Sequence, residues 1–338
     1  MKRSGIGLLI LAFAAALLLR PQVARAGSWV NGSVSTSYGA RNYRLWVPAG
    51  YAPGTPAPLV MMLHGCTQSP TDFAAGTNMN GLADANGFLV LYPEQPSSID
   101  ANKCWQWWDP AHQARGAGEP AILAAMVGDV QGGYAVDPAR RYVAGISAGA
   151  AMTVIMGATY PDLFSAIGVV AGLEYKATTS KLSAYTAMSQ GGPNPDTQGQ
   201  LAYQAMGSAK ARVRAIVFHG TSDYTVAPVN GDQVLSQWAQ TNDYVDDGAN
   251  NNSVDNAADA TLNGSVPGGR SYVKTSYNDA AGGLLLEKWL IQGMGHAWPG
   301  GSTAGTYTDP QGPNASAELW RFFSGGAGPA PTSTPGAT

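Results

Sequence analysis

The amino-acid sequence predicts an α/β fold in which a mostly parallel β-sheet carries helices on both faces. Short apolar segments of strand length alternate with longer segments of helical character, which is the pattern of such a sheet. The length of 338 residues suits one large domain with a sizeable core. The 43 glycines and 22 prolines indicate many turns and long surface loops between the elements.

Apolar runs bounded by turn-forming residues predict the strands. An antiparallel hairpin is expected first, over residues 33–38 and 43–47, with a turn near Gly39. The core strands are expected at 59–63, 88–92, 141–144, 166–170, 213–218 and 284–290.

Helices are predicted between these strands. Ser316 or Asn314 is a suitable N-cap for the last of them. The polar segment 246–269, rich in Asn, Asp and Gly, predicts a long loop. The helices are expected at 71–85, 120–130, 148–160, 229–240 and 316–323.

The first 26 residues have the pattern of a secretory signal peptide. Lys2 and Arg3 precede an apolar run that is too short for a membrane span, and an Ala-x-Ala site ends at Ala26. The alternative is a membrane anchor. Cleavage would remove four basic residues and leave 15 basic against 22 acidic ones, a net charge of -7. Such a charge argues against binding to nucleic acid or to an anionic membrane.

The predicted catalytic domain spans residues 27–324, and residues 325–338 form a Gly/Pro/Thr-rich tail that is typical of a disordered linker. We expect a secreted or periplasmic protein with no membrane anchor after cleavage. Its two cysteines, Cys66 and Cys104, suggest one disulfide in an oxidising compartment, or else two buried thiols. Metal-ligand spacings such as C-x-x-C do not occur, so we expect no metal and no cofactor.

Residues 145–149 read Gly-Ile-Ser-Ala-Gly and fall between a predicted strand and a predicted helix. In this context G-x-S-x-G is the nucleophile elbow of an α/β-hydrolase fold, which exposes the Ser147 hydroxyl at the end of its strand. The alternative is an ordinary tight turn. The Ala148 amide, at the start of the following helix, is placed to donate to an oxyanion.

A serine hydroxyl needs a base, and in this fold the acid and then the base follow the serine along the chain. His219 and His296 are therefore the candidates, and we favour His296 because it lies in a Gly-flanked loop after the last strand. His219 ends a core strand and is expected to be structural. Asp223 is the expected acid because it follows that same strand.

The loop that begins at His64 follows the first core strand and is expected to supply the second oxyanion donor. The backbone amide of Cys66 is the best candidate, with His64 orienting the loop rather than reacting. Aromatic side chains cluster after Cys104, and another tryptophan follows His296. An apolar wall for the substrate is therefore predicted from Trp105, Trp107, Trp108 and Trp298, against the alternative that they belong to the core.

Five segments resemble, together and in order, the poly(3-hydroxybutyrate) depolymerase family of esterases, which also includes feruloyl and acetylxylan esterases. They are HGCTQ (64–68), CWQWWD (104–109), GISAGA (145–150), HGTSDYTV (219–226) and GMGHAWPGG (293–301). The resemblance implies Ser147, Asp223 and His296 as a triad, the Cys66 and Ala148 amides as the oxyanion hole, and a Cys66–Cys104 disulfide that fixes the loop carrying that hole.

The resulting hypothesis is a secreted serine esterase that cleaves poly- or oligo(3-hydroxybutyrate)-type esters through an acyl-enzyme. The alternatives are a feruloyl or acetylxylan esterase, an acyltransferase, and an inactive polymer-binding protein, which the intact triad disfavours. Polymer-degrading relatives often carry a separate binding domain after such a linker. Here the linker-like tail ends at Thr338, so we expect poor activity on crystalline polymer.

Overall fold

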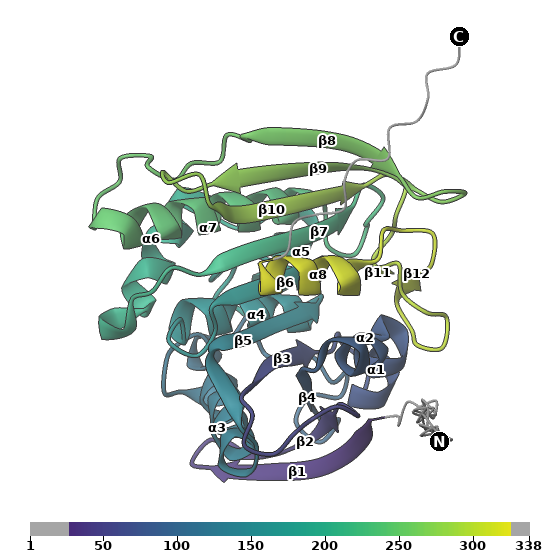
Figure 1. Cartoon of the computed structure of the whole chain (residues 1–338). Coiled ribbons are helices and arrows are strands. Elements are labelled where there is room, and N and C mark those ends of the chain that lie inside the picture. The colour runs from purple at the N-terminus through teal and green to yellow at the C-terminus, as the bar shows by residue number, and fades with distance from the viewer. Residues whose placement is uncertain (1–26, 326–338) are drawn as a thin grey trace, which may run out of the picture.

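A single ten-stranded sheet organises the chain in the computed structural model, which describes residues 27–325 (Figure 1). Its strand order is β1-β2-β4-β3-β5-β6-β7-β10-β9-β8. The central strands from β4 to β10 pair in parallel, whereas the strands at both edges pair antiparallel. The predicted fold class, an α/β-hydrolase fold, is confirmed. In sheet order the strands are β1 (Ser28–Thr36), β2 (Gly39–Val47), β4 (Leu89–Pro93), β3 (Ala57–Leu63), β5 (Val136–Ile146), β6 (Ala166–Val170), β7 (Arg214–Gly220), β10 (Leu284–Ile291), β9 (Ser271–Asn278) and β8 (Ala260–Ser265).

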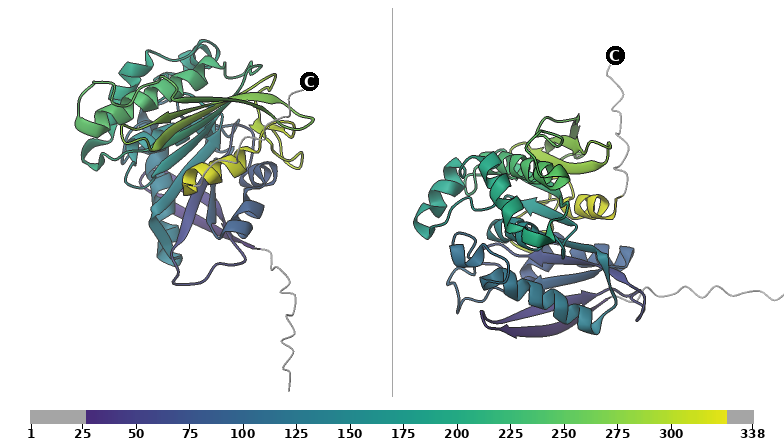
Figure 2. Two further views of the ribbon diagram at one scale, coloured as in Figure 1. Left: turned by 45° about the horizontal axis from the view of Figure 1, so that its top comes forward. Right: turned by 90° about the vertical axis from the view of Figure 1, so that its left-hand side faces the viewer.

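The helices form a layer on each face of this sheet (Figure 2). Helices α3, α4, α5, α6 and α7 contribute to one apolar core, and α1, α2 and α8 contribute to the other. Two 3₁₀ turns, Pro110–His112 and Gly207–Ala209, and a two-stranded ribbon of β11 (Trp298–Pro299) and β12 (Thr308–Asp309) complete the structure. The helices are α1 (Pro70–Thr77), α2 (Met79–Asn86), α3 (Gly118–Gly133), α4 (Ala148–Thr159), α5 (Lys181–Gln190), α6 (Pro195–Ala205), α7 (Val229–Asp247) and α8 (Ala315–Ser324).

Strand β3 shows why the central strands read as continuous apolar runs. Successive side chains of a strand point to opposite faces of the sheet. Accordingly Leu59 and Met61 pack in the core with α3 and α4, while Val60 packs in the core with α8. A strand that is covered on both faces therefore needs apolar residues at every position. All seven residues of β3 are buried.

The predicted hairpin, core strands and long helices are present, with bounds that differ by a few residues. The helix expected at 71–85 is two helices, because Asn78 adopts a left-handed conformation with φ of 50° between α1 and α2. Of the two possible caps of the last helix, it is Asn314 whose side chain accepts a hydrogen bond, from the Ala317 amide.

The segment expected as one long loop, 246–269, contains strand β8, and this expectation is wrong. Strand β8 lies at the edge of the sheet, where only one neighbour and little apolar packing are needed, so its polar sequence did not indicate a strand. Strand β9 and helices α5 and α6 were also not predicted, since their sequences are largely polar and partly exposed. The signal peptide and all but the first residue of the tail lie outside the described residues.

None of the helices within residues 27–325 combines the length and apolar character needed to cross a membrane.

Residue Glu174, in the segment between β6 and α5, is an unusual feature of the interior. Its side chain is buried, and neither carboxylate oxygen has a hydrogen-bond partner among the described residues. Burial raises the pKa of this carboxyl to about 8, because the charged form loses its hydration.

This burial predicts a pH-dependent stability that one substitution should remove. Between the ordinary carboxyl pKa of 4.5 and about 8, the native state binds a proton that the unfolded chain releases, so stability falls as the pH rises. Glu174→Gln should flatten this dependence by up to ~1.4 kcal/mol per pH unit. Urea unfolding of both proteins at several pH values across this window measures the difference. Parallel curves for the two proteins would contradict the prediction.

Candidate active site

Ser147 stands at the sharp turn between strand β5 and helix α4. Its backbone has φ of 57° and ψ of -123°, a conformation that is strained for a residue with a side chain. The strain is typical of a nucleophile elbow, where the chain turns from strand to helix within one residue. Such a turn holds the hydroxyl at the carboxyl end of the parallel strands, and Ser147 lines a cavity there.

The two glycines of the elbow are required by close backbone approaches. A Cβ atom on Gly149 would lie 2.1 Å from the Leu63 carbonyl oxygen and 2.5 Å from that of His64. A Cβ atom on Gly145 would lie 2.5 Å from the carbonyl carbon of Gly149. Only glycine lets α4 start this close to the end of β3, and the same approach brings Ser147 beside the loop that follows β3.

His296 and Asp223 are joined by a hydrogen bond of 2.7 Å between Nδ1 of the ring and Oδ2 of the carboxylate. The Asp223 oxygen Oδ1 accepts from the backbone N–H groups of Thr225 and Val226, each at 2.9 Å. Burial opposes ionisation of this carboxyl, but the His296 ring and the Val226 amide favour it more strongly, and its pKa is held below its ordinary value. Asp223 is therefore an ionised, immobile partner that directs Nε2 of His296 away from itself.

His296 and Ser147 line the same cavity. The structure thus brings together the three residues that the sequence predicts as a triad, from the ends of β5, β7 and β10. Among the described residues no hydrogen bond joins the Ser147 hydroxyl to the His296 ring. Catalytic hydrogen bonds of this kind are commonly long in a free enzyme and tighten when the substrate binds.

His219 is placed as a structural residue. Its Nε2 donates to the Val226 carbonyl at 2.9 Å and lies 3.6 Å from Asp223 Oδ2, and the ring is fully buried. Burial lowers its pKa, so the ring is neutral at neutral pH. It does not line the cavity. Its hydrogen bond instead holds the turn at Val226, whose amide also binds Asp223.

The two residues whose backbone N–H groups are predicted as oxyanion donors, Cys66 and Ala148, both lie at the cavity. Ala148 is the first residue of α4, where an amide has no partner within its helix, and the helix dipole adds positive character. Neither amide donates a hydrogen bond to another described residue, and both residues line the cavity with Ser147. Preorganised free donors at a nucleophile stabilise the oxyanion of acyl transfer.

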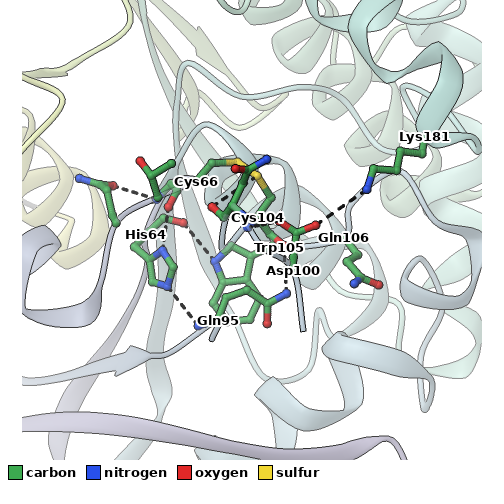
Figure 3. Close-up of a disulfide and its surroundings, with 12 residues drawn as sticks. His64, Cys66, Gln95, Asp100, Cys104, Trp105, Gln106 and Lys181 are labelled. Carbon is green, nitrogen blue, oxygen red and sulfur yellow. Dashed lines mark hydrogen bonds and ion pairs between the residues drawn. A yellow bond between two sulfur atoms is a disulfide. The ribbon is translucent and has the colours of Figure 1, made fainter. Parts of the chain in front are cut away.

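A disulfide joins Cys66 to Cys104 at the cavity wall (Figure 3). The bond predicted from the sequence is confirmed, and it ties the loop after β3 to the loop that carries the tryptophans. The Thr67 amide donates to the Asn102 carbonyl at 2.5 Å, which adds a backbone connection beside the disulfide. Cys66 therefore belongs to a doubly anchored loop.

The cavity has a volume of about 340 Å³ and a mainly apolar lining. Trp107 and Trp108 line it as expected, in contact with each other at 5.7 Å between ring centroids. Lys181 packs over the Trp108 ring at 5.4 Å and lies 4.0 Å from the Asp100 carboxylate.

The expectation that Trp105 and Trp298 form part of this wall is corrected, because neither lines the cavity and each is only 1% exposed. Trp105 donates from its indole to the His64 carbonyl at 3.0 Å, at the start of the loop after β3. Trp298 packs against Phe73 on the far face of the sheet and donates to the Ser316 hydroxyl at 3.1 Å. Both indoles bury their ring and satisfy their N–H group inside the protein, as core tryptophans do.

Much of the cavity lining was not predicted from the sequence. The only signal was the apolar character of single residues inside polar segments, because helix α5 has no periodic apolar face. Tyr307 lies on the ribbon loop and its hydroxyl is within 3.1 Å of that of Thr67. Within residues 27–325 no group of three His, Cys, Asp or Glu side chains is placed to hold a metal ion. The lining residues that were not predicted include Leu173, Ala184, Tyr185, Met188 and Tyr307.

Comparison with known proteins gives one consistent family. The family model described as Esterase PHB depolymerase matches residues 41–259. Poly(3-hydroxyalkanoate) depolymerase C of Paucimonas lemoignei is 37% identical over 257 residues, which cover 75% of this chain and 57% of that protein. Acetylxylan esterase A of Emericella nidulans is 34% identical over 209 residues, 58% of this chain and 66% of that protein. The chain therefore spans less than two thirds of the length of these relatives.

Solved structures agree on the fold. An acetyl xylan esterase from Aspergillus awamori superposes with a TM-score of 0.65 at 26% identity, covering 79% of this chain and 94% of that one. A feruloyl esterase module from Clostridium thermocellum superposes with a TM-score of 0.53 at 15% identity, covering 82% and 84%. The second similarity is one of fold alone.

The placement of the two histidines predicts opposite effects of their removal. His296→Ala should lower ester-hydrolysis kcat by roughly 10³-fold or more, since the serine loses its base. His219→Asn should keep kcat within about tenfold while costing about 1–3 kcal/mol, because the buried Val226 carbonyl loses its donor. Kinetics and urea unfolding of both variants provide the measurement. Retained activity in His296→Ala with loss in His219→Asn would reverse the assignment.

The close approach at Gly149 predicts that a single methyl group disturbs both stability and catalysis. Gly149→Ala should cost about 1–3 kcal/mol, because the methyl meets two fixed carbonyl oxygens. It should also lower kcat by about 10²-fold as the elbow shifts from the oxyanion loop.

The control is Gly128→Ala on α3, where a Cβ meets nothing within 4 Å. That change should stabilise by about 0.5–1 kcal/mol and leave kcat unchanged. Equal effects of the two changes would be evidence against the packing argument.

Proposed function

The chain belongs to the PHB depolymerase family of esterases, and on this premise we propose that it is a serine carboxylic-ester hydrolase that works through an acyl-enzyme. The observation that supports this proposal is that Ser147, His296, Cys66 and Ala148 line one cavity, with Asp223 hydrogen-bonded to His296 behind it. In acyl transfer each of these groups has a defined task.

The proposed reaction begins when His296 Nε2 takes the proton of the Ser147 hydroxyl as the oxygen attacks the ester carbonyl carbon. The carbonyl oxygen becomes an oxyanion, which the Cys66 and Ala148 amides stabilise. His296 then gives the proton to the leaving alcohol as the carbon–oxygen bond breaks, and the acyl group stays on Ser147. Water repeats the sequence with the same base and releases the acid.

The substrate that we propose is a poly- or oligo(3-hydroxybutyrate)-type ester. Beyond the apolar cavity lining, the elements that form the cavity carry large exposed apolar side chains. Leu182 and Tyr185 on α5 are 91% and 77% exposed, and Tyr185 lines the cavity, as does Tyr307 on the ribbon loop. Tyr224, beside Asp223 in the chain, is 93% exposed. Exposed apolar side chains on these elements would suit a hydrophobic chain that extends beyond the cavity.

A second candidate is an acetyl or feruloyl ester of plant polysaccharide. The similarity to acetylxylan esterases in sequence and in structure favours it, since the triad alone does not select the acyl group. The mainly apolar lining of the cavity argues for the polyester, because sugar rings are bound by aromatic and polar groups together.

We also propose that the protein works outside the cytosol. The disulfide between Cys66 and Cys104 supports this, because such bonds persist in oxidising compartments and are rare where glutathione keeps thiols reduced.

A panel of esters tests the substrate proposal. Dissolved 3-hydroxybutyrate trimer should be cleaved with a kcat/KM at least about tenfold above those for methyl ferulate and acetylated xylan, because one apolar subsite is worth about 1–3 kcal/mol. Product release measured by chromatography gives the rates. The control is Ser147→Ala, which should lose about 10³-fold or more in activity and remain folded.

Two results would contradict different parts of the proposal. Activity on methyl ferulate alone would transfer the enzyme to the second candidate class. Near-normal hydrolysis by a folded Ser147→Ala protein would show that Ser147 is not the nucleophile.

A further inference from the structure

A bridge between two hydroxyl groups joins the loop after β3 to the loop of the two-stranded ribbon. The hydroxyls of Thr67 and Tyr307 lie 3.1 Å apart, in a hydrogen bond that either can donate. Both residues line the cavity that Ser147 and His296 also line. Thr67 is exposed and Tyr307 is 46% exposed, so the bridge lies where the cavity opens to solvent.

Both residues of the bridge have a backbone conformation that favours glycine. Thr67 has φ of 66° and Tyr307 has φ of 52°. Positive φ is uncommon for any residue with a side chain, and most of all for a β-branched one such as threonine. Among the described non-glycine residues with positive φ, only one other lines the cavity, and it is Ser147. Strained backbone of this kind is typical of functional sites, so the two side chains are expected to act at the cavity.

Backbone contacts hold both strained positions. The Thr67 amide donates to the Asn102 carbonyl at 2.5 Å, and the Tyr307 carbonyl accepts from the Trp298 amide at 2.7 Å. The residue before Tyr307 donates twice to Asp72 of α1, which Figure 1 shows beside the ribbon. None of these bonds uses the side chain of Thr67 or of Tyr307, so apart from the bridge itself both side chains are available to a bound molecule.

The position of Tyr307 relative to His296 indicates which part of an ester it meets. The two rings lie edge to face, with centroids 6.5 Å apart and planes at 77°. In the proposed reaction His296 gives a proton to the oxygen of the leaving alcohol, so the alcohol must approach the His296 ring. The acyl moiety stays on Ser147. A side chain that lies beside the His296 ring at the cavity is therefore placed to contact the alcohol moiety.

From these observations we propose that Tyr307 is a specificity-determining residue for the alcohol moiety of the ester, and that its hydrogen bond to Thr67 holds the ring in place. The inference rests on the proposed esterase function. An aromatic ring offers an apolar face to an alkyl chain, and its hydroxyl keeps a polar partner. Because the bridge is exposed, its loss should cost the fold little, whereas the choice of alcohol should change.

Two isomeric esters separate the alcohol side from the acyl side. Hexyl butyrate and methyl nonanoate have the same composition, but the long alkyl chain belongs to the alcohol in the first and to the acid in the second. Glycine suits the backbone at position 307, so Tyr307→Gly removes the ring without new strain. The ratio of kcat/KM for hexyl butyrate to kcat/KM for methyl nonanoate should fall about tenfold in this variant, because an apolar contact to the alcohol is lost.

The matched control is Tyr38→Gly, in the turn between β1 and β2. Tyr38 is 49% exposed, close to the exposure of Tyr307, and it does not line the cavity. This change should leave the ratio and both values of kcat/KM as they are in the wild-type protein.

A double-mutant cycle tests the bridge itself. Tyr307→Phe keeps the ring and Thr67→Val keeps the β-branched side chain, and each removes one hydroxyl. Each change should lower the ester ratio by about threefold, and the double variant should also show about threefold, because both changes break the same hydrogen bond. The urea midpoints of the single variants should equal that of the wild-type protein, which separates a role in specificity from a structural one.

Each contrary result overturns a different statement. An unchanged ester ratio in Tyr307→Gly, or a ratio that rises, would show that Tyr307 does not select the alcohol. If that variant does not fold, an unchanged ratio in Tyr307→Phe overturns the assignment equally. A fall of about ninefold in the double variant, the product of the two single effects, would show that the hydroxyls act separately. Wild-type protein inactive on both esters would instead remove the proposed esterase function, and this is measured before any variant.

Discussion

The contact between the elbow and the end of strand β3 is the constraint on which the site depends. Strands β3 and β5 are parallel neighbours, with Leu63 opposite Gly145. Gly149, in the first turn of helix α4, lies against the carbonyls of Leu63 and His64 at a distance that no side chain would allow. This approach places Ser147, at the end of β5, beside the loop that follows β3. The strain at Ser147 is tolerated because sheet pairing and helix packing fix both sides of the turn.

The site uses buried hydrogen bonds in place of flexible polar contacts. Three of the four histidines of the sequence, His64, His219 and His296, lie near the catalytic elements, and their surroundings give them different roles. The first two are fully buried and bonded to backbone groups, so burial lowers their pKa values and they stay neutral. Only His296 combines partial exposure with a carboxylate partner. Its environment therefore suits proton transfer, whereas the other two suit fixed donation.

The regular segments and the chemical motifs could be predicted from the sequence, because their causes are local. A strand such as β3 that is buried on both faces must be apolar throughout, and an elbow needs glycines on both sides of its serine. Strand β8 and helix α5 could not be predicted, since an edge strand and a partly exposed helix impose few demands on their residues. The tryptophans show the same limit. Trp105 and Trp108 occur in one motif, yet one faces the core and the other the cavity.

By itself the sequence determined the fold class and the elbow at Ser147. It also identified Asp223 and His296, the two residues that the structure joins by a hydrogen bond. Each of these depends on residue type and chain order, which the sequence states directly. Only the tertiary structure decided which aromatic side chains line the cavity and which lie in the core. That division depends on groups distant in the chain, such as the His64 carbonyl for Trp105 and Ser316 for Trp298. They arise only when the sheet brings these groups together.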